Sequence, residues 1–129
     1  MKKRLKVSIT IIILLFITVL YINIHTSNKN KDEGIIGLPK GELLNETTSP
    51  KDKYTVKTYV SDKGGATVDF AVRGELIVNN NNSKPKNIYW EYKVNKGEID
   101  WENEDTVIIN GRKIKLPNEI YDWRIDNEE

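Results

Sequence analysis

The sequence of 129 residues contains no cysteine and a single histidine, His25. Without cysteine the chain has no disulfide scaffold, no thiol nucleophile, no thiolate metal ligand and no site for a lipidated cysteine. With only one histidine, most of the remaining types of catalytic site and zinc site are also excluded. His25 follows an apolar block directly, so we interpret it as an ordinary interfacial residue. These absences predict no catalytic residue, no cofactor and no metal site.

Charge is also absent from residues 7–24, whereas the segment before them holds four basic side chains. A helix of about 18 residues spans about 27 Å, close to the thickness of a bilayer's hydrocarbon core. The apolar residues would surround such a helix instead of forming one stripe. We therefore predict that 7–24 is a transmembrane signal anchor with the lipid bilayer as its partner.

Two alternatives for this segment are a cleaved signal peptide and a buried helix of a soluble protein. A cleavage site needs small residues, but the stretch from Tyr21 to His25 is bulky. The basic residues ahead of the span predict a cytoplasmic N-terminus, because positive charge stays on the inner side. The expected location is thus the cell membrane, single-pass, with the C-terminal domain outside.

These features divide the chain into five parts. A cytoplasmic basic stub covers 1–6, the signal anchor 7–24, a polar stalk 25–36, an extracytoplasmic β domain 37–125 and an acidic tail 126–129. The part beyond the anchor holds all 19 acidic residues but only the 16 basic residues left after the four of the stub. An acidic body disfavours nucleic acid as a partner.

Within the body, apolar residues alternate with polar ones at a period of two, which is typical of half-buried strands. The alternation predicts strands near 54–60, 68–78, 88–94, 99–101, 107–109 and 114–116. The turns between them are expected at 62–65, 79–86, 95–97 and Asn110-Gly111. No window repeats at helical spacing. The predicted fold is an N-terminal transmembrane helix followed by an all-β domain, a small antiparallel β-meander, sandwich or open barrel of about six strands.

Two details of the strand pattern are specific enough to check. The clearest set of residues expected on one face is Ile88, Trp90, Tyr92 and Val94. Gly74 interrupts an otherwise apolar strand, which indicates a β-bulge or a close approach of another chain segment.

Four residues are candidates for binding. Arg73 and Glu75 share a face of the same predicted strand, where they can form an ion pair, lie at an edge, or present a guanidinium that grips a carboxylate or phosphate. Trp123 and Arg124 suggest a stacking and cation site, although a closing strand that buries the indole explains them as well.

Two further segments allow alternatives. The acidic residues between 98 and 105 alternate with Ile99 and Trp101, which predicts a solvated strand surface; a cation site or a catalytic carboxylate pair are the alternatives. An apolar island is either the first strand of the fold or a segment that docks on a membrane or partner. Its members are Ile35, Ile36, Leu38, Leu43 and Leu44.

Several short motifs follow one another in order over 37–124. They are Leu38-Pro39-Lys40-Gly41-Glu42, Ser49-Pro50 with Tyr54, Gly64-Gly65-Ala66-Thr67, Val72-Arg73-Gly74-Glu75-Leu76, Asn87-Ile88-Tyr89-Trp90, Asp105-Thr106-Val107-Ile108-Ile109-Asn110-Gly111 and Tyr121-Asp122-Trp123-Arg124. This order resembles an uncharacterised family, a domain of unknown function, of short single-span or exported membrane proteins of Gram-positive bacteria. The resemblance implies a single-span extracytoplasmic β protein, and it implies no catalytic residue because the family has no assigned activity.

The favoured function is a non-enzymatic binding or envelope-associated module with a protein or cell-envelope partner. Such a module should show an exposed apolar patch or a long unpaired edge strand. The alternative is a small carboxylate-dependent hydrolase acting on cell-wall glycan, with its carboxylates drawn from 98–105. A third alternative is a body that only spaces or stabilises a membrane complex.

Overall fold

The computed structural model describes residues 2–62 and 69–126, and the side chains of these residues except those of Leu5 and 27–32. The chain forms two compact units, residues 1–30 and 31–129. Most of the turn predicted at 62–65, and the first residue of the strand predicted to follow it, lie outside the described residues.

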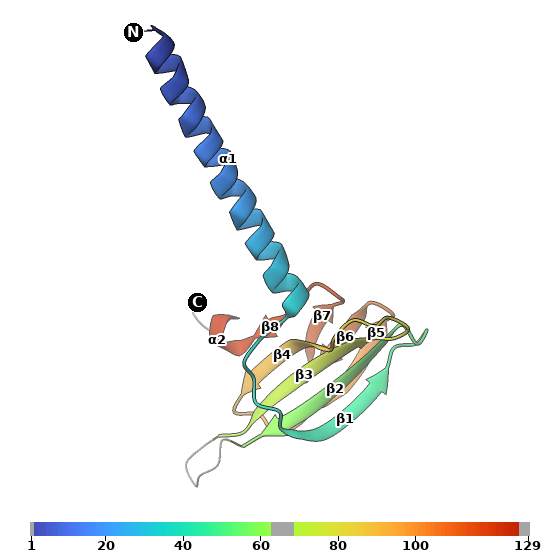
Figure 1. Cartoon of the computed structure of the whole chain (residues 1–129). Helices are drawn as coiled ribbons and strands as arrows, with labels where there is room; N and C mark the ends of the chain where they lie inside the picture. The colour runs from blue at the N-terminus through green and yellow to red at the C-terminus, as the bar shows by residue number, and fades with distance from the viewer. Residues whose placement is uncertain (1, 63–68, 127–129) are drawn as a thin grey trace. The chain divides into compact units, whose positions relative to one another are not determined.

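The first element is helix α1, Lys2–Glu33, drawn in blue in Figure 1. Its part from Lys2 to Thr26 is long and apolar enough to cross a membrane. Side-chain hydroxyls in this part bond back to the helix backbone, as Thr10 does to the carbonyl of Lys6 at 2.8 Å, which removes their cost in lipid. The helix also continues through much of the segment predicted as a polar stalk.

The body is built from strands, as the period-two pattern predicted. The strands are β1 (Glu42–Thr48), β2 (Tyr54–Ser61), β3 (Ala71–Val78), β4 (Lys86–Tyr92), β5 (Ile99–Asn103), β6 (Thr106–Ile109), β7 (Arg112–Lys115) and β8 (Tyr121–Asp122), followed by the one-turn helix α2 (Trp123–Asp126). In the described residues these eight strands include all six that the sequence predicted. Strand β1 agrees at Leu43 and Leu44 with the first-strand alternative for the apolar island, and the two-residue β8 is an addition.

The strands form two sheets and no closed barrel. The large sheet has the order β1-β2-β3-β4-β8 and the small sheet the order β5-β6-β7. All neighbours pair antiparallel except β4 and β8. The β6–β7 hairpin turns at Asn110 and Gly111 with φ of 48° and 82°, which confirms the predicted two-residue turn.

The main core lies between the two sheets. Its fully buried aliphatic and aromatic residues come from both, among them Val56, Val72, Leu76, Ile88, Tyr89, Val107, Ile109 and Ile114. Gly74 lets the sheets meet, because a Cβ there would lie 2.8 Å from Cβ of Tyr89 and 2.9 Å from Cδ1 of Ile109. The register between β3 and β4 also shifts after Gly74. Of the two alternatives predicted for this glycine, the close approach is present at Gly74 itself, and a bulge lies opposite it on β4.

The register shift overturns one prediction. Gly74 pairs with Tyr89 and Glu75 with Asn87, so Ile88 has no partner on β3. This bulge places Ile88 and Tyr89 together in the main core, whereas Trp90 belongs to a second cluster. The sequence had put Ile88 and Trp90 on one face, which is wrong because strict alternation fails at a bulge.

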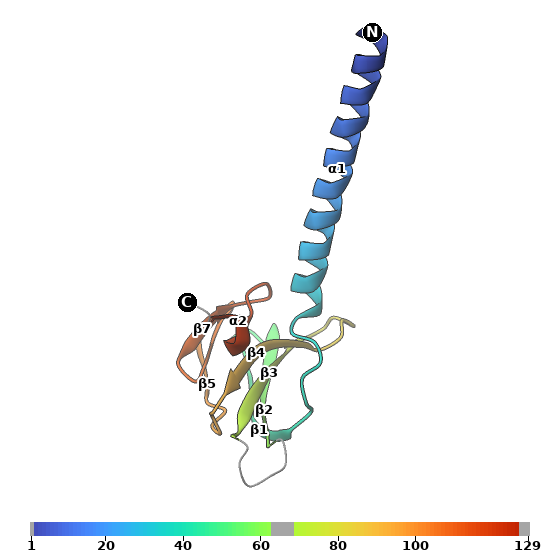
Figure 2. The ribbon, with the colours of Figure 1, turned by 90° about the vertical axis from the view of Figure 1, so that its left-hand side faces the viewer.

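The second cluster lies on the other face of the large sheet, under residues 34–41, which we call the strap. Figure 2 shows the strap on the opposite side of the large sheet from β5 and β7. Ile35 is 5% exposed and packs with Ala71 and Trp90. The apolar island is thus divided, since Ile35 and Leu38 cover the sheet while Leu43 and Leu44 belong to β1.

Candidate functional site

Arg73 and Glu75 form the ion pair that their spacing allowed, with 2.8 Å between Nη1 of Arg73 and Oε2 of Glu75. The guanidinium also donates to Oδ1 of Asn87 at 2.9 Å and to the carbonyl of Lys40 at 2.7 Å. It stacks on the ring of Tyr59 at 4.1 Å. Arg73 is only 6% exposed, so these contacts hold the strap against the large sheet.

Trp123 and Arg124 lie elsewhere, in helix α2. The ring of Trp123 contacts that of Tyr92, with 5.4 Å between centroids, and packs partly buried against the main core. Arg124 donates twice to Asp122, from Nε at 2.9 Å and from Nη2 at 2.6 Å. These bonds lower the pKa of Asp122, against the effect of burial. The four predicted binding residues therefore lie in two separate places, with Arg73 paired to Glu75, Trp123 against Tyr92 and Arg124 bonded to Asp122.

The acidic residues between 98 and 105 also divide. Glu98, Asp100 and Glu102 are exposed, and Asp100 and Glu102 alternate along β5 with the half-buried Ile99 and Trp101, which agrees with the predicted solvated surface. Asp105 pairs with Lys53 at 3.2 Å.

Glu104 has a structural position instead. Its carboxylate accepts hydrogen bonds from the Ser49 hydroxyl at 2.5 Å and from the backbone N–H of Lys51 and Lys53 at 2.5 and 3.1 Å. Burial alone would raise the pKa of Glu104, but these hydrogen bonds outweigh it and hold the pKa below its ordinary value. Glu104 thereby joins the β5–β6 turn to the β1–β2 turn.

A third polar cluster connects β4 with the β6–β7 hairpin. The Tyr89 hydroxyl bonds to Glu91 and accepts from Nδ2 of Asn110 at 3.1 Å. Burial and the neighbouring Glu91 raise the pKa of Tyr89. Arg112 lies over the ring of Tyr121 at 4.0 Å and pairs with Glu91 at 3.5 Å. This cluster ties the two sheets together.

In the described part of the chain, no group of three or more His, Cys, Asp or Glu side chains is placed to hold a metal ion. His25 stacks on Tyr21 one helical turn away, with 5.7 Å between ring centroids. The body also presents strand edges, which are surfaces suited to recognition.

Strand β1 provides such an edge. It lies at the end of the large sheet and, among the described residues, pairs with β2 only. Six of its seven residues are exposed, including Leu43 at 55% and Leu44 at 40%. An exposed edge strand offers a row of backbone donors and acceptors to a second chain.

The edge is partly protected by the chain itself. The backbone N–H of Glu46 donates to Oδ1 of Asn45 at 2.9 Å instead of to a strand. Leu44 forms a bulge, because Leu43 pairs with Tyr59 and Asn45 with Thr58. These features blunt the edge in the free protein, so an incoming strand must displace the Asn45 side chain.

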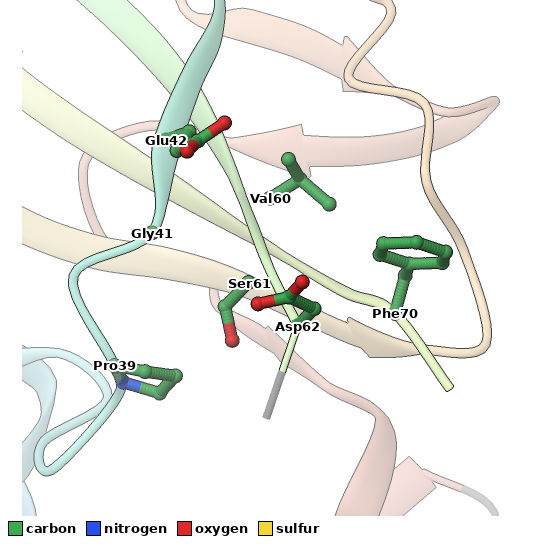
Figure 3. Close-up of a pocket in the computed structure, with 7 residues that line it drawn as sticks. All are labelled: Pro39, Gly41, Glu42, Val60, Ser61, Asp62 and Phe70. Atoms are coloured by element: carbon green, nitrogen blue, oxygen red, sulfur yellow. The ribbon is translucent and has the colours of Figure 1, made fainter. Parts of the chain in front are cut away.

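A cavity of about 220 Å³ opens at the start of β1 (Figure 3). Its lining comes from the end of the strap, the start of β1, the end of β2 and the residue before β3: Pro39, Gly41, Glu42, Val60, Ser61, Asp62 and Phe70. The Ser61 hydroxyl is buried and has no hydrogen-bond partner among residues 2–62 and 69–126. Phe70 remains 45% exposed.

The sequence analysis did not identify this edge or this cavity. The sequence did contain one signal for the edge, because Leu43 and Leu44 were recognised as part of a candidate first strand. The cavity combines residues from four segments, and only the fold brings Glu42 and Asp62 to one place.

Comparison with known proteins gives a family without an assigned role. The model of a family of unknown function, DUF5412, matches residues 2–126, so the chain belongs to that family. This match confirms the resemblance to an uncharacterised family that the ordered motifs indicated. None of the curated proteins and none of the solved structures compared with the chain matches it.

Proposed function

We propose that this member of the family of unknown function is a membrane-anchored, non-enzymatic binding module. In this proposal α1 crosses the cell membrane once with its N-terminus in the cytoplasm. The β domain then lies outside, in the envelope of a Gram-positive bacterium, and binds an extended segment of a partner protein along β1. The candidate membrane span and its basic N-terminal flank support the anchoring.

The single observation that supports binding best is the exposed edge of β1. Strand addition obtains affinity from main-chain hydrogen bonds and specificity from side-chain pockets beside the edge. The large sheet offers seven residues at β1 but only two at its other end, β8. Exposed Leu43 and Leu44 add apolar area that a partner can cover.

An anchor helps such a module, because it confines the protein to a thin layer beside the membrane. Confinement raises the effective concentration of the module for membrane-bound partners, so modest affinity at β1 suffices. No observation favours the carboxylate-dependent hydrolase, since three of the five acidic residues are spread along a strand surface and two are engaged with the β1–β2 turn.

The proposal is tested by photo-crosslinking in cells from a reactive residue placed at position 43, with Lys113 on exposed β7 as the control position. We expect an adduct with a defined protein from position 43 and none from position 113. Glu46→Pro removes an N–H that points away from β2, so it should abolish the adduct while the β1–β2 pairing remains.

Glu46→Gln is the matched control, because it removes the same carboxylate and the ion pair with Lys57 but keeps the N–H. The adduct should persist in this variant. An adduct of equal yield in Glu46→Pro, or from both positions, would contradict binding at the edge of β1.

A further inference from the structure

We infer that the cavity at the start of β1 is a pocket for a lysine or arginine side chain of the partner's extended segment. This inference rests on the proposed function, because it assigns a specificity to the same edge. The lining supplies what a long cationic side chain needs: negative charge, a free hydroxyl and an apolar wall.

The negative charge comes from Glu42 and Asp62, which both line the cavity (Figure 3). Several other carboxylates of the body have cationic partners, such as Glu75 with Arg73 and Glu102 with Lys113. In the described part of the chain, no ion pair or hydrogen bond engages the carboxylate of Glu42 or of Asp62. Two unneutralised carboxylates beside one cavity complement an ammonium or a guanidinium.

The second observation is Ser61, which is 7% exposed and whose hydroxyl has no hydrogen-bond partner in the part of the chain that the structure describes. Burying a hydroxyl without a hydrogen bond is unfavourable. A donor that enters the cavity and reaches this oxygen would offset that cost. Lysine and arginine carry only donors, so they fit a cavity whose lining holds an orphaned hydroxyl and two acceptor carboxylates.

The remaining lining suits the aliphatic stem. Pro39, Val60 and Phe70 provide apolar surface, and a cation above an aromatic ring gains further attraction. The volume of about 220 Å³ lies below the roughly 300–1,000 Å³ typical of sites for small-molecule ligands. A single long side chain therefore fits this cavity better than a free metabolite does.

The position of the cavity links it to the edge. Glu42 is the first residue of β1 and pairs with Val60 of β2, and both line the cavity. A chain segment paired along β1 passes the cavity at one end. Because side chains alternate along a strand, one residue of the bound segment can enter the cavity while its backbone remains on the edge.

The test uses the full-length protein in lipid nanodiscs and a fluorescent heptapeptide of alternating threonine and valine with one lysine. The matched peptides carry methionine or glutamate in place of the lysine, and N-acetyl-lysine amide serves as the free amine. We expect the lysine peptide to bind about tenfold more tightly than the methionine peptide. The glutamate peptide should bind more weakly still, and the free amine should not compete.

Glu42→Gln combined with Asp62→Asn should remove the tenfold preference, whereas Glu98→Gln combined with Asp100→Asn, at β5 of the small sheet, should leave it unchanged. Equal binding of all three peptides, abolished by Glu46→Pro, would overturn the pocket and leave the edge intact. Binding of no peptide would overturn both. If N-acetyl-lysine amide displaced the fluorescent peptide as effectively as unlabelled lysine peptide does, the idea that the pocket is coupled to a strand bound at β1 would be overturned.

Discussion

Asn87 and Ile35 exchange two hydrogen bonds across the outer face of the large sheet. The N–H of Ile35 donates to the carbonyl of Asn87 at 2.9 Å, and Nδ2 of Asn87 donates to the carbonyl of Ile35 at 2.9 Å. Gly34 forms a parallel bridge to the same residue. The strap is thus fixed to β4 within two residues of the last residue of α1.

Replacement of Asn87 by alanine should loosen the strap. The variant leaves the Ile35 carbonyl without its donor and one N–H of Arg73 without its acceptor. Each buried polar group left unpaired costs about 1–3 kcal/mol. We expect faster hydrogen exchange at the Ile35 amide and a lower free energy of unfolding. Asn81→Ala in the β3–β4 loop is the control. Unchanged exchange at Ile35 in Asn87→Ala would contradict the role of this side chain.

The contribution of Glu104 should depend on pH. Its pKa in the folded protein lies below the ordinary value of 4.5, so its hydrogen bonds stabilise the fold fully above about pH 5.5 and lose this effect as the pH falls through 4.5 toward the folded-state pKa. Glu104→Gln should therefore lower the urea midpoint at pH 7, and the difference from the natural chain should shrink at pH 3. Glu102→Gln serves as the exposed control. An equal difference at both pH values would contradict this origin.

A side chain at position 74 should strain the contact between the sheets. Gly74→Ala brings a Cβ within 3 Å of Tyr89 and Ile109, and overpacking of this kind costs about 1–3 kcal/mol. Ile109→Val removes the methyl group that the added Cβ would meet. The double variant should therefore lose less stability than the sum of the two single variants. Additive losses in urea unfolding would show that the two sites do not touch.

Removal of the Asn45 side chain should improve binding at β1. Asn45→Ala frees the N–H of Glu46 for an incoming strand, and one hydrogen bond contributes about 0.5–1.5 kcal/mol net. The affinity for the lysine heptapeptide should rise by about two- to tenfold in fluorescence titration with the full-length chain in nanodiscs. Asn118→Ala, beyond β7, is the control. Weaker binding in Asn45→Ala would mean that its amide helps the partner instead of protecting the edge.

Much of the fold follows from local sequence. Period-two alternation located six strands, because each has one face in the main core and one in contact with solvent or the strap. Asn110-Gly111 predicted its turn, because positive φ at both positions favours these residues. Gly74 predicted a close approach because glycine has no side chain, and the structure shows that a Cβ would have no room there.

The features that the sequence did not reveal depend on contacts between distant segments. Gly74 indicated a bulge, but its place on β4, at Ile88, depends on the register with β3, which no local pattern sets. Arg73 was considered as a ligand-binding residue, yet its partners include Lys40 and Asn87, which are far from it in sequence. The cavity at β1 likewise needs Asp62 and Phe70 to meet Glu42 across three segments.

The most direct test concerns the placement of the β domain outside the membrane. The natural chain has no cysteine, so Ser83→Cys in an exposed loop of the body and Lys3→Cys in the basic stub each introduce a single thiol. A membrane-impermeant maleimide applied to intact cells should label the thiol at position 83 at once and the thiol at position 3 only after permeabilisation. Labelling of position 3 in intact cells, or protection of position 83 until the cells are opened, would contradict an anchored module that faces outward.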